Sequence, residues 1–251
     1  MASNEHQTIS PDDLVSMDSL CSRFPLRIDL VYADPCHPEN IFQTSLYRPE
    51  AKLWLHRDLA DIVVLAASEC FRETGNFFVL KDGLRPVDVQ VAMHETKIVK
   101  ANPHWTTDET RMLALPGKGG HPRGMAIDIT LETEDGRALD MGTRFDHLPY
   151  NPYDNPSSRT YEKISNNAKI NRHLLCNAMM EAATAYSRPL LPLPSEWWDF
   201  RFPAVFSERY SPIFESDLPL AKQMTSRRRE GTDADAPCSA QIARIKMEWS
   251  R

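Results

Sequence analysis

The chain has 251 residues, of which 41% are hydrophobic, and this length suffices for one sizeable catalytic domain. The formal net charge of −6 gives no excess of lysine and arginine, which excludes a general phosphate-binding surface and predicts no nucleic-acid partner. No apolar run approaches the roughly 18 residues that cross a bilayer, and no signal-peptide pattern opens the chain. We therefore expect a cytoplasmic protein with no membrane partner.

The first half of the chain predicts two strands and two helices. We expect residues 1–22 to form a loose arm or a short helix and residues 23–222 to form the catalytic domain. Alternating apolar residues predict a strand over 26–32. Apolar residues recur every three to four positions over 49–74, before a glycine at 75, and predict a long helix. We next expect a strand over 76–81 and then a helix that begins at Pro86.

The second half predicts an antiparallel hairpin, another long helix and a final strand. The strand 125–132 should turn at 134–136 and return over 138–141. Helical periodicity covers 164–187, and an aromatic strand is expected over 196–202. Residues 223–251 should be a flexible tail, with a linker over 225–237 and a brief helix over 242–249. The predicted fold class is α+β, a small antiparallel sheet flanked by helices.

The first candidate site surrounds the start of the strand 125–132. His121 follows Gly119 and Gly120, and Asp128 comes seven residues later. An imidazole nitrogen and a carboxylate oxygen placed in this way can share one metal ion. Glycine lets the backbone approach closely enough for that arrangement. Because aspartate is depleted from strands, Asp128 among apolar residues favours a functional role over a surface position.

The second candidate site is the segment Ser-Glu-Trp-Trp-Asp-Phe at 195–200. In an extended strand, Glu196 and Asp199 would project to opposite sides, so they can share one metal centre only if the segment bends. This favours a division of labour, in which one carboxylate binds the metal and the other is the general base toward a metal-activated water. The competing interpretation makes the two acids ordinary exposed charges beside core tryptophans.

A third candidate is Arg85, which follows the turn at 82–83 and is fixed by Pro86. A guanidinium in that position can bind a carboxylate or stabilise negative charge that develops on a carbonyl oxygen. The alternative is a surface ion pair, which is common for arginine.

Four motifs, taken in order, resemble the D-alanyl-D-alanine dipeptidase family of vancomycin-resistance-type zinc D,D-dipeptidases. They are Asp-Gly-Leu-Arg-Pro at 82–86, His-Pro-Arg-Gly-Met-Ala-Ile-Asp at 121–128, Met-Gly-Thr-Arg-Phe-Asp at 141–146 and Glu-Trp-Trp-Asp at 196–199. The resemblance covers residues 30–202, and its specificity lies in the order and spacing of the motifs. It implies a zinc enzyme with the fold of the D-Ala-D-Ala metallopeptidases.

The resemblance also implies a role for each site residue. His121 and Asp128 would be metal ligands, Glu196 would activate water and pass its proton to the leaving amine, and Arg85 would stabilise the oxyanion of the tetrahedral intermediate. A separate substrate pocket is implied for the free ammonium group, lined by Tyr32, Asp82 and Asp146. A buried carboxylate needs a cationic partner, which an acylated peptide cannot supply.

Two departures from the family pattern concern the metal and the substrate. The family has a histidine as third zinc ligand where this chain has Asp199, so the expected metal ligands become His121, Asp128 and Asp199. A second carboxylate lowers the net positive charge of the centre and shifts its preference from Zn²⁺ toward Mn²⁺ or another divalent ion. Gly119 and Gly120 stand where the family often has serines that hold the substrate's carboxylate.

The sequence thus predicts metal-dependent hydrolysis of D-alanyl-D-alanine or a similar small dipeptide, with a place in peptidoglycan turnover. One alternative is a catalytically impaired dipeptide-binding protein on the same scaffold. Another is a dipeptidase for a different cell-wall-derived dipeptide. His104 or His147 is a further candidate for the missing imidazole ligand. The oligomeric state is left open.

Overall fold

The computed structural model describes residues 6–107, 111–225 and 236–249. Its α-helices are α1 (Arg57–Thr74), α2 (Val87–His94), α3 (Lys97–Ala101), α4 (Asn166–Ala185), α5 (Ala204–Ser207) and α6 (Ala236–Trp249). Its strands are β1 (Leu14–Ser16), β2 (Leu26–Ile28), β3 (Trp54–His56), β4 (Phe77–Asp82), β5 (Ala126–Glu132), β6 (Leu191–Pro192) and β7 (Asp199–Arg201). This mixture confirms the predicted α+β class.

The main sheet of the described chain has the strand order β2-β4-β5-β7-β6. All its neighbouring strands are antiparallel except β2 and β4, which run parallel, so the sheet is mixed rather than purely antiparallel. The central strand β5 is buried almost from end to end and carries Ile127, Ile129 and Leu131 into the core. β4, β5 and β7 place Asp82, Asp128 and Asp199 side by side.

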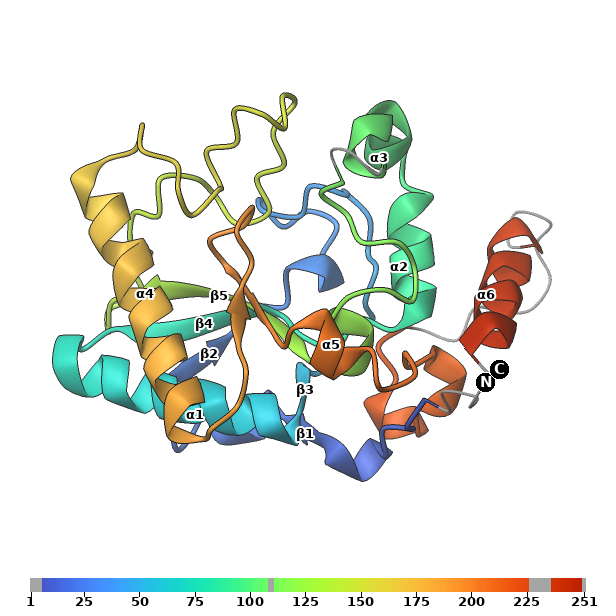
Figure 1. Ribbon diagram of the computed structural model, residues 1–251, viewed down its shortest axis with the longest axis horizontal. Helices are drawn as coiled ribbons and strands as arrows, with labels where there is room; N and C mark the ends of the chain where they lie inside the picture. The colour runs from blue at the N-terminus through green and yellow to red at the C-terminus, as the bar shows by residue number, and fades with distance from the viewer. Residues whose placement is uncertain (1–5, 108–110, 226–235, 250–251) are drawn as a thin grey trace.

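The long helices α1 and α4 pack against each other beside the sheet (Figure 1). α1 ends at Gly75, whose φ of 73° suits a glycine in the left-handed region. α4 begins at Ser165, whose hydroxyl accepts a hydrogen bond of 3.0 Å from the backbone nitrogen of Ala168. Both predicted helices are confirmed, with shorter bounds. On the other side of the molecule, α2 lies beside α6 (Figure 1).

The N-terminal segment is packed onto the body, which corrects the expectation of a loose arm. β1 pairs antiparallel with β3, and Ile9, Leu14 and Met17 are buried. Burial of these apolar side chains offsets the entropy that ordering the segment costs. The predicted C-terminal linker over 225–237 lies largely outside the described residues, whereas α6 contains the predicted helix 242–249 and packs on α2.

Three other predicted elements differ in extent. The first strand ends at Ile28, and the segment 31–33 forms a 3₁₀ turn instead. The return strand over 138–141 is reduced to a single bridge between Glu132 and Ala138. The final strand starts only at Asp199, and the residues before it form a turn. No helix in the described ranges is long and apolar enough to cross a membrane.

Candidate active site

Three aspartates form a row across the centre of the main sheet. Asp82 at the end of β4 pairs with Asp128 of β5, and Asp128 pairs with Asp199 at the start of β7. All three side chains are buried. Like charges directly opposite each other destabilise a sheet, so this row requires cationic partners.

His121 faces the row from the 3₁₀ turn His121–Arg123, just before β5. Its Nδ1 lies 2.8 Å from the carbonyl oxygen of Gly83, and because a carbonyl can only accept, Nδ1 carries a proton. Its Nε2 lies 3.7 Å from Oδ1 of Asp128 and 3.3 Å from Oδ2 of Asp199. A lone pair on Nε2 would repel both oxygens, so a proton or a metal ion belongs among them.

Two glycines let the backbone segments around His121 approach closely. A Cβ on Gly83 would lie 2.7 Å from the carbonyl oxygen of Trp54, and a Cβ on Gly120 would lie 2.6 Å from that of Met125. Neither position has room for a side chain. The expected reason for glycine before His121 is therefore confirmed.

Arg85 is the cationic partner of Asp82. Its Nε and Nη2 donate to Oδ2 of Asp82 at 2.8 and 2.5 Å, and the Tyr47 hydroxyl donates to Oδ1 at 2.6 Å. Burial alone would lower the pKa of Arg85, but Asp82, together with Tyr32, Tyr47 and Asp128, raises the pKa well above its usual value. Asp82 is fully buried behind Arg85 and is absent from the described pocket lining, so the structure places it as the anchor of Arg85.

Arg201 is the cationic partner of Asp199. Its Nε donates to Oδ1 at 2.7 Å, and its Nη2 donates to Oδ2. Burial alone would raise the pKa of Asp199, but Arg201 and His121 hold it well below the usual range. Arg201 was not among the predicted site residues. Alternation along the strand was the available signal, because residues 199 and 201 project from the same face.

Asp128, in the middle of the row, has no comparable partner. Its Oδ1 is buried and makes no hydrogen bond with the described part of the chain, and its Oδ2 lies 3.7 Å from Nη2 of Arg85. Burial, and then the charges of Asp199 and Asp82, raise the pKa of Asp128 well above its usual value. A buried carboxylate oxygen aimed at an imidazole nitrogen suits a cation, and Asp82, His121 and Asp128 together could hold a metal ion.

Glu196 lies in the turn that leads into β7. Its backbone nitrogen donates to Leu193, and its carbonyl oxygen accepts from the nitrogen of Asp199. This turn supplies the bend that two carboxylates three residues apart need to face one site. Burial, and then the charge of Asp199, raise the pKa of Glu196 to about 8. Glu196 and Asp199 are thus buried rather than ordinary exposed charges, although Trp197 and Trp198 do belong to the core.

Asp146 and Tyr32 form a second polar group in the same pocket. The Tyr32 hydroxyl donates a hydrogen bond of 2.8 Å to Oδ2 of Asp146. Burial raises the pKa of Asp146 to about 6. Asp146 has a φ of 58°, and such left-handed backbone outside glycine is frequent at functional sites.

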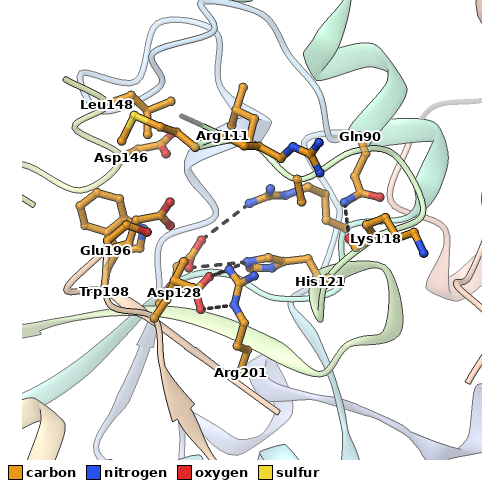
Figure 2. A pocket seen from close by; sticks show the side chains of 18 of the residues that line it. Gln90, Arg111, Lys118, His121, Asp128, Asp146, Leu148, Glu196, Trp198 and Arg201 are labelled. Atoms are coloured by element: carbon orange, nitrogen blue, oxygen red, sulfur yellow. Dashed lines mark hydrogen bonds and ion pairs between the residues drawn. The ribbon is translucent and has the colours of Figure 1, made fainter. Parts of the chain in front are cut away.

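One pocket of about 200 Å³ unites these groups. It is lined by Tyr32, Arg85, His121, Asp128, Asp146, Glu196, Asp199 and Arg201, together with further residues at its rim that include Gln90, Arg111 and Lys118. Figure 2 shows Asp146 and Glu196 on one side, Arg111 and Lys118 on the other, and His121, Asp128 and Arg201 between them. The anionic groups and the cationic rim could therefore receive opposite ends of a small zwitterion.

Comparison with known proteins agrees with this geometry. A family model described as D-ala-D-ala dipeptidase (Peptidase_M15) matches residues 14–216. The chain belongs to this family. A D-alanyl-D-alanine dipeptidase from Escherichia coli (strain K12) is 31% identical over 197 residues, which are 78% of this chain and 89% of the relative. A D-alanyl-D-alanine dipeptidase from Enterococcus faecium is 31% identical over 148 residues, which are 55% of this chain and 67% of the relative.

The chain is therefore a dipeptidase, and the family resemblance of its four motifs is confirmed. In this dipeptidase every predicted site residue except Asp82 lines the single pocket described above. Among the described residues that line it, neither His104 nor His147 is present, so neither is placed to replace the third ligand. Arg201 and the rim residues are additions that only the folded chain reveals.

Proposed function

We propose that this dipeptidase hydrolyses D-alanyl-D-alanine or a similar small dipeptide and that it uses a divalent metal ion. The observation that carries the proposal is the buried Oδ1 of Asp128, which faces Nε2 of His121 and makes no hydrogen bond with the described residues. Zinc is the ion expected for the family, and Mn²⁺ or another divalent ion is an alternative because Asp199 is a hard oxygen ligand.

The proposed ligands are His121, Asp128 and Asp199. Asp82 lies close to His121 as well, but its Oδ2 faces Nδ1, the nitrogen that already donates to Gly83. Both Asp82 and Asp199 are bound by an arginine, so the orientation toward His121 separates them: Asp199 faces Nε2. Nε2 is thus the ring nitrogen with a free lone pair, and it faces Asp128 and Asp199.

The protein's own groups carry the remaining chemistry. A divalent ion supplies positive charge that makes water more acidic and polarises a carbonyl oxygen. Glu196 would accept a proton from the attacking water and deliver it to the leaving amine, and its pKa of about 8 suits both steps near neutral pH. Arg85, held by Asp82, would donate hydrogen bonds to the carbonyl oxygen as negative charge develops on it.

The ends of the dipeptide would be held by groups of opposite charge. Asp146, supported by Tyr32, would pair with the substrate's ammonium group. The cationic rim at Lys118 lies across the pocket and would attract the carboxylate (Figure 2). A free ammonium group on the residue before the scissile bond then becomes a requirement, which excludes acylated and N-terminally extended peptides. A cytoplasmic location is part of the same proposal.

The test is hydrolysis of D-Ala-D-Ala by the purified protein with Zn²⁺ or Mn²⁺, measured as released D-alanine. N-acetyl-D-Ala-D-Ala is the matched control, because it keeps the scissile bond and lacks the ammonium group. We expect turnover of the free dipeptide alone and loss of both turnover and bound metal in His121→Ala.

Turnover without metal would contradict the proposed metal dependence. Binding of the dipeptide without turnover under any metal would favour a dipeptide-binding protein on the same scaffold. Preference for a dipeptide of other chirality in a defined panel would redirect the proposal to a different cell-wall-derived substrate.

A further inference from the structure

We propose that Arg201 is the charge-compensating partner of Asp199 and that the two act as one neutral ligand unit, which keeps a bound divalent ion electrophilic. This inference rests on the metal site of the proposed function. It assigns Arg201 a positioning and electrostatic role that no sequence motif suggested.

The geometry of the pair supports this role. Two nitrogens of Arg201 donate to the two oxygens of Asp199, with Nε 2.7 Å from Oδ1. Such a fork fixes the carboxylate plane and leaves each oxygen one further lone pair. The remaining lone pair of Oδ2 is available to a metal ion, because Oδ2 also lies 3.3 Å from Nε2 of His121. Asp199 can therefore serve as a ligand through one oxygen while it remains bound to Arg201.

The charges of the centre explain why the pair matters. A divalent ion held by neutral His121 and two carboxylates has its charge cancelled, which weakens its pull on a carbonyl oxygen or a water. Arg201 restores one positive charge. The side chain of Arg201 is mostly buried and that of Asp199 almost wholly so, and water screens such a pair little. The sequence predicts that Asp199 makes the bound ion less electrophilic. Arg201, two residues further along the strand, offsets this effect.

Arg85 gives the row a second pair of the same kind, which shows why Asp128 is the exception. Arg85 Nη2 lies 2.5 Å from Asp82, and Arg201 binds Asp199, whereas the guanidinium of Arg85 comes no nearer to Asp128 than 3.7 Å. Two guanidinium groups thus serve three carboxylates. Asp128 is the carboxyl group without a guanidinium of its own, and it lies beside Nε2 of His121, where a divalent ion would be drawn.

The test compares divalent-ion affinity, measured by calorimetric titration of Zn²⁺ and Mn²⁺, in wild type, Arg201→Met and Arg201→Lys. Removal of a positive charge next to the ion should tighten binding in Arg201→Met by at least about tenfold and lower kcat. Arg201→Lys retains the charge and should stay within about threefold of wild type in affinity. Tighter ion binding together with slower turnover is a combination that a merely structural role would not produce.

A double variant keeps the test decisive if Arg201→Met does not fold. Asp199→Asn alone leaves Arg201 unpaired beside the ion and should weaken ion binding strongly. Asp199→Asn combined with Arg201→Met replaces the pair by a neutral amide and should recover about tenfold or more of that loss. Failure of the second substitution to recover affinity would overturn the inference.

Two outcomes separate the role of Arg201 from the presence of the metal site itself. Ion binding that His121→Ala abolishes and Arg201→Met leaves unchanged or weaker would overturn the role of Arg201 alone. Absence of ion binding in the wild type would overturn both.

Discussion

The Tyr32 hydroxyl donates a 2.8 Å hydrogen bond to the Asp146 carboxylate, and this contact joins residues 114 positions apart in the chain. It fixes a buried acid whose backbone lies in the left-handed region at a φ of 58°. Both features aim one carboxylate into the pocket that Glu196 and His121 share. The contact therefore bears directly on how pH governs substrate binding.

We expect kcat/KM to fall below a pH of about 8, where the base Glu196 becomes protonated, and to fall more steeply below about 6, where Asp146 also loses its charge. Asp146→Asn should remove the steeper fall below pH 6 while the limb due to Glu196 remains, and it should raise KM by about tenfold or more. Asparagine tolerates left-handed backbone, so the fold is kept. A pH profile of kcat/KM checks this, and an unchanged acidic limb in Asp146→Asn would contradict it.

Glu196→Gln should abolish turnover while the protein still binds its metal ion, because the amide keeps the shape of the acid and cannot accept a proton. Because burial raises the pKa of Glu196 from 4.5 to about 8 in the folded protein, the acid takes up a proton on folding, and this costs more free energy as the pH rises from about 4.5 to about 8. The variant should therefore have a higher Tm at neutral pH. Glu181→Gln, at an exposed position of α4, is the control and should change neither property. Near-normal turnover in Glu196→Gln would refute the base assignment.

Gly83→Ala should weaken both the fold and the site. The new Cβ would lie 2.7 Å from the carbonyl oxygen of Trp54, and relief of that contact would move the carbonyl group that anchors His121. We expect a loss of about 1–3 kcal/mol in the free energy of unfolding and weaker metal binding. Gly75→Ala is the comparison, because open space surrounds it and only its φ of 73° opposes a side chain. It should lose stability and keep its affinity for metal.

Trp249 lies outside residues 14–216, which the family model matches, yet Trp249→Ala should loosen the rim of the pocket. Lys118 Nζ and Arg123 Cζ lie 4.8 and 4.7 Å from the centre of the Trp249 ring. A Cβ on Gly117 would lie 3.0 Å from Nε1 of the same ring. Gln90 holds the same loop through the backbone of Gly117. We expect KM to rise with kcat largely unchanged, and a loss of about 1–2 kcal/mol in unfolding free energy.

The control for this change is Arg244→Ala, on the same helix with its side chain largely exposed. Steady-state kinetics and thermal unfolding of both variants provide the measurement. Equal KM values for the two variants would show that α6 does not brace the rim.

The sequence by itself determined the α+β class, the two long helices, the central strand and the family. These features depend on local patterns: apolar periodicity predicts α1 and α4, and motif order identifies the dipeptidase relatives. It also selected His121, Asp128 and Glu196, because unusual residue types beside glycines and strand starts are visible without coordinates.

Only the tertiary structure decided how these groups are paired. The row of Asp82, Asp128 and Asp199 depends on the register between β4, β5 and β7, which no local pattern encodes. Each arginine is a near neighbour of its aspartate in the chain, and the register brings the Asp82–Arg85 and Asp199–Arg201 pairs to the two sides of Asp128. The need for the pair of Asp199 and Arg201 depends on the tertiary structure, because only the paired strands bring three buried carboxylates side by side.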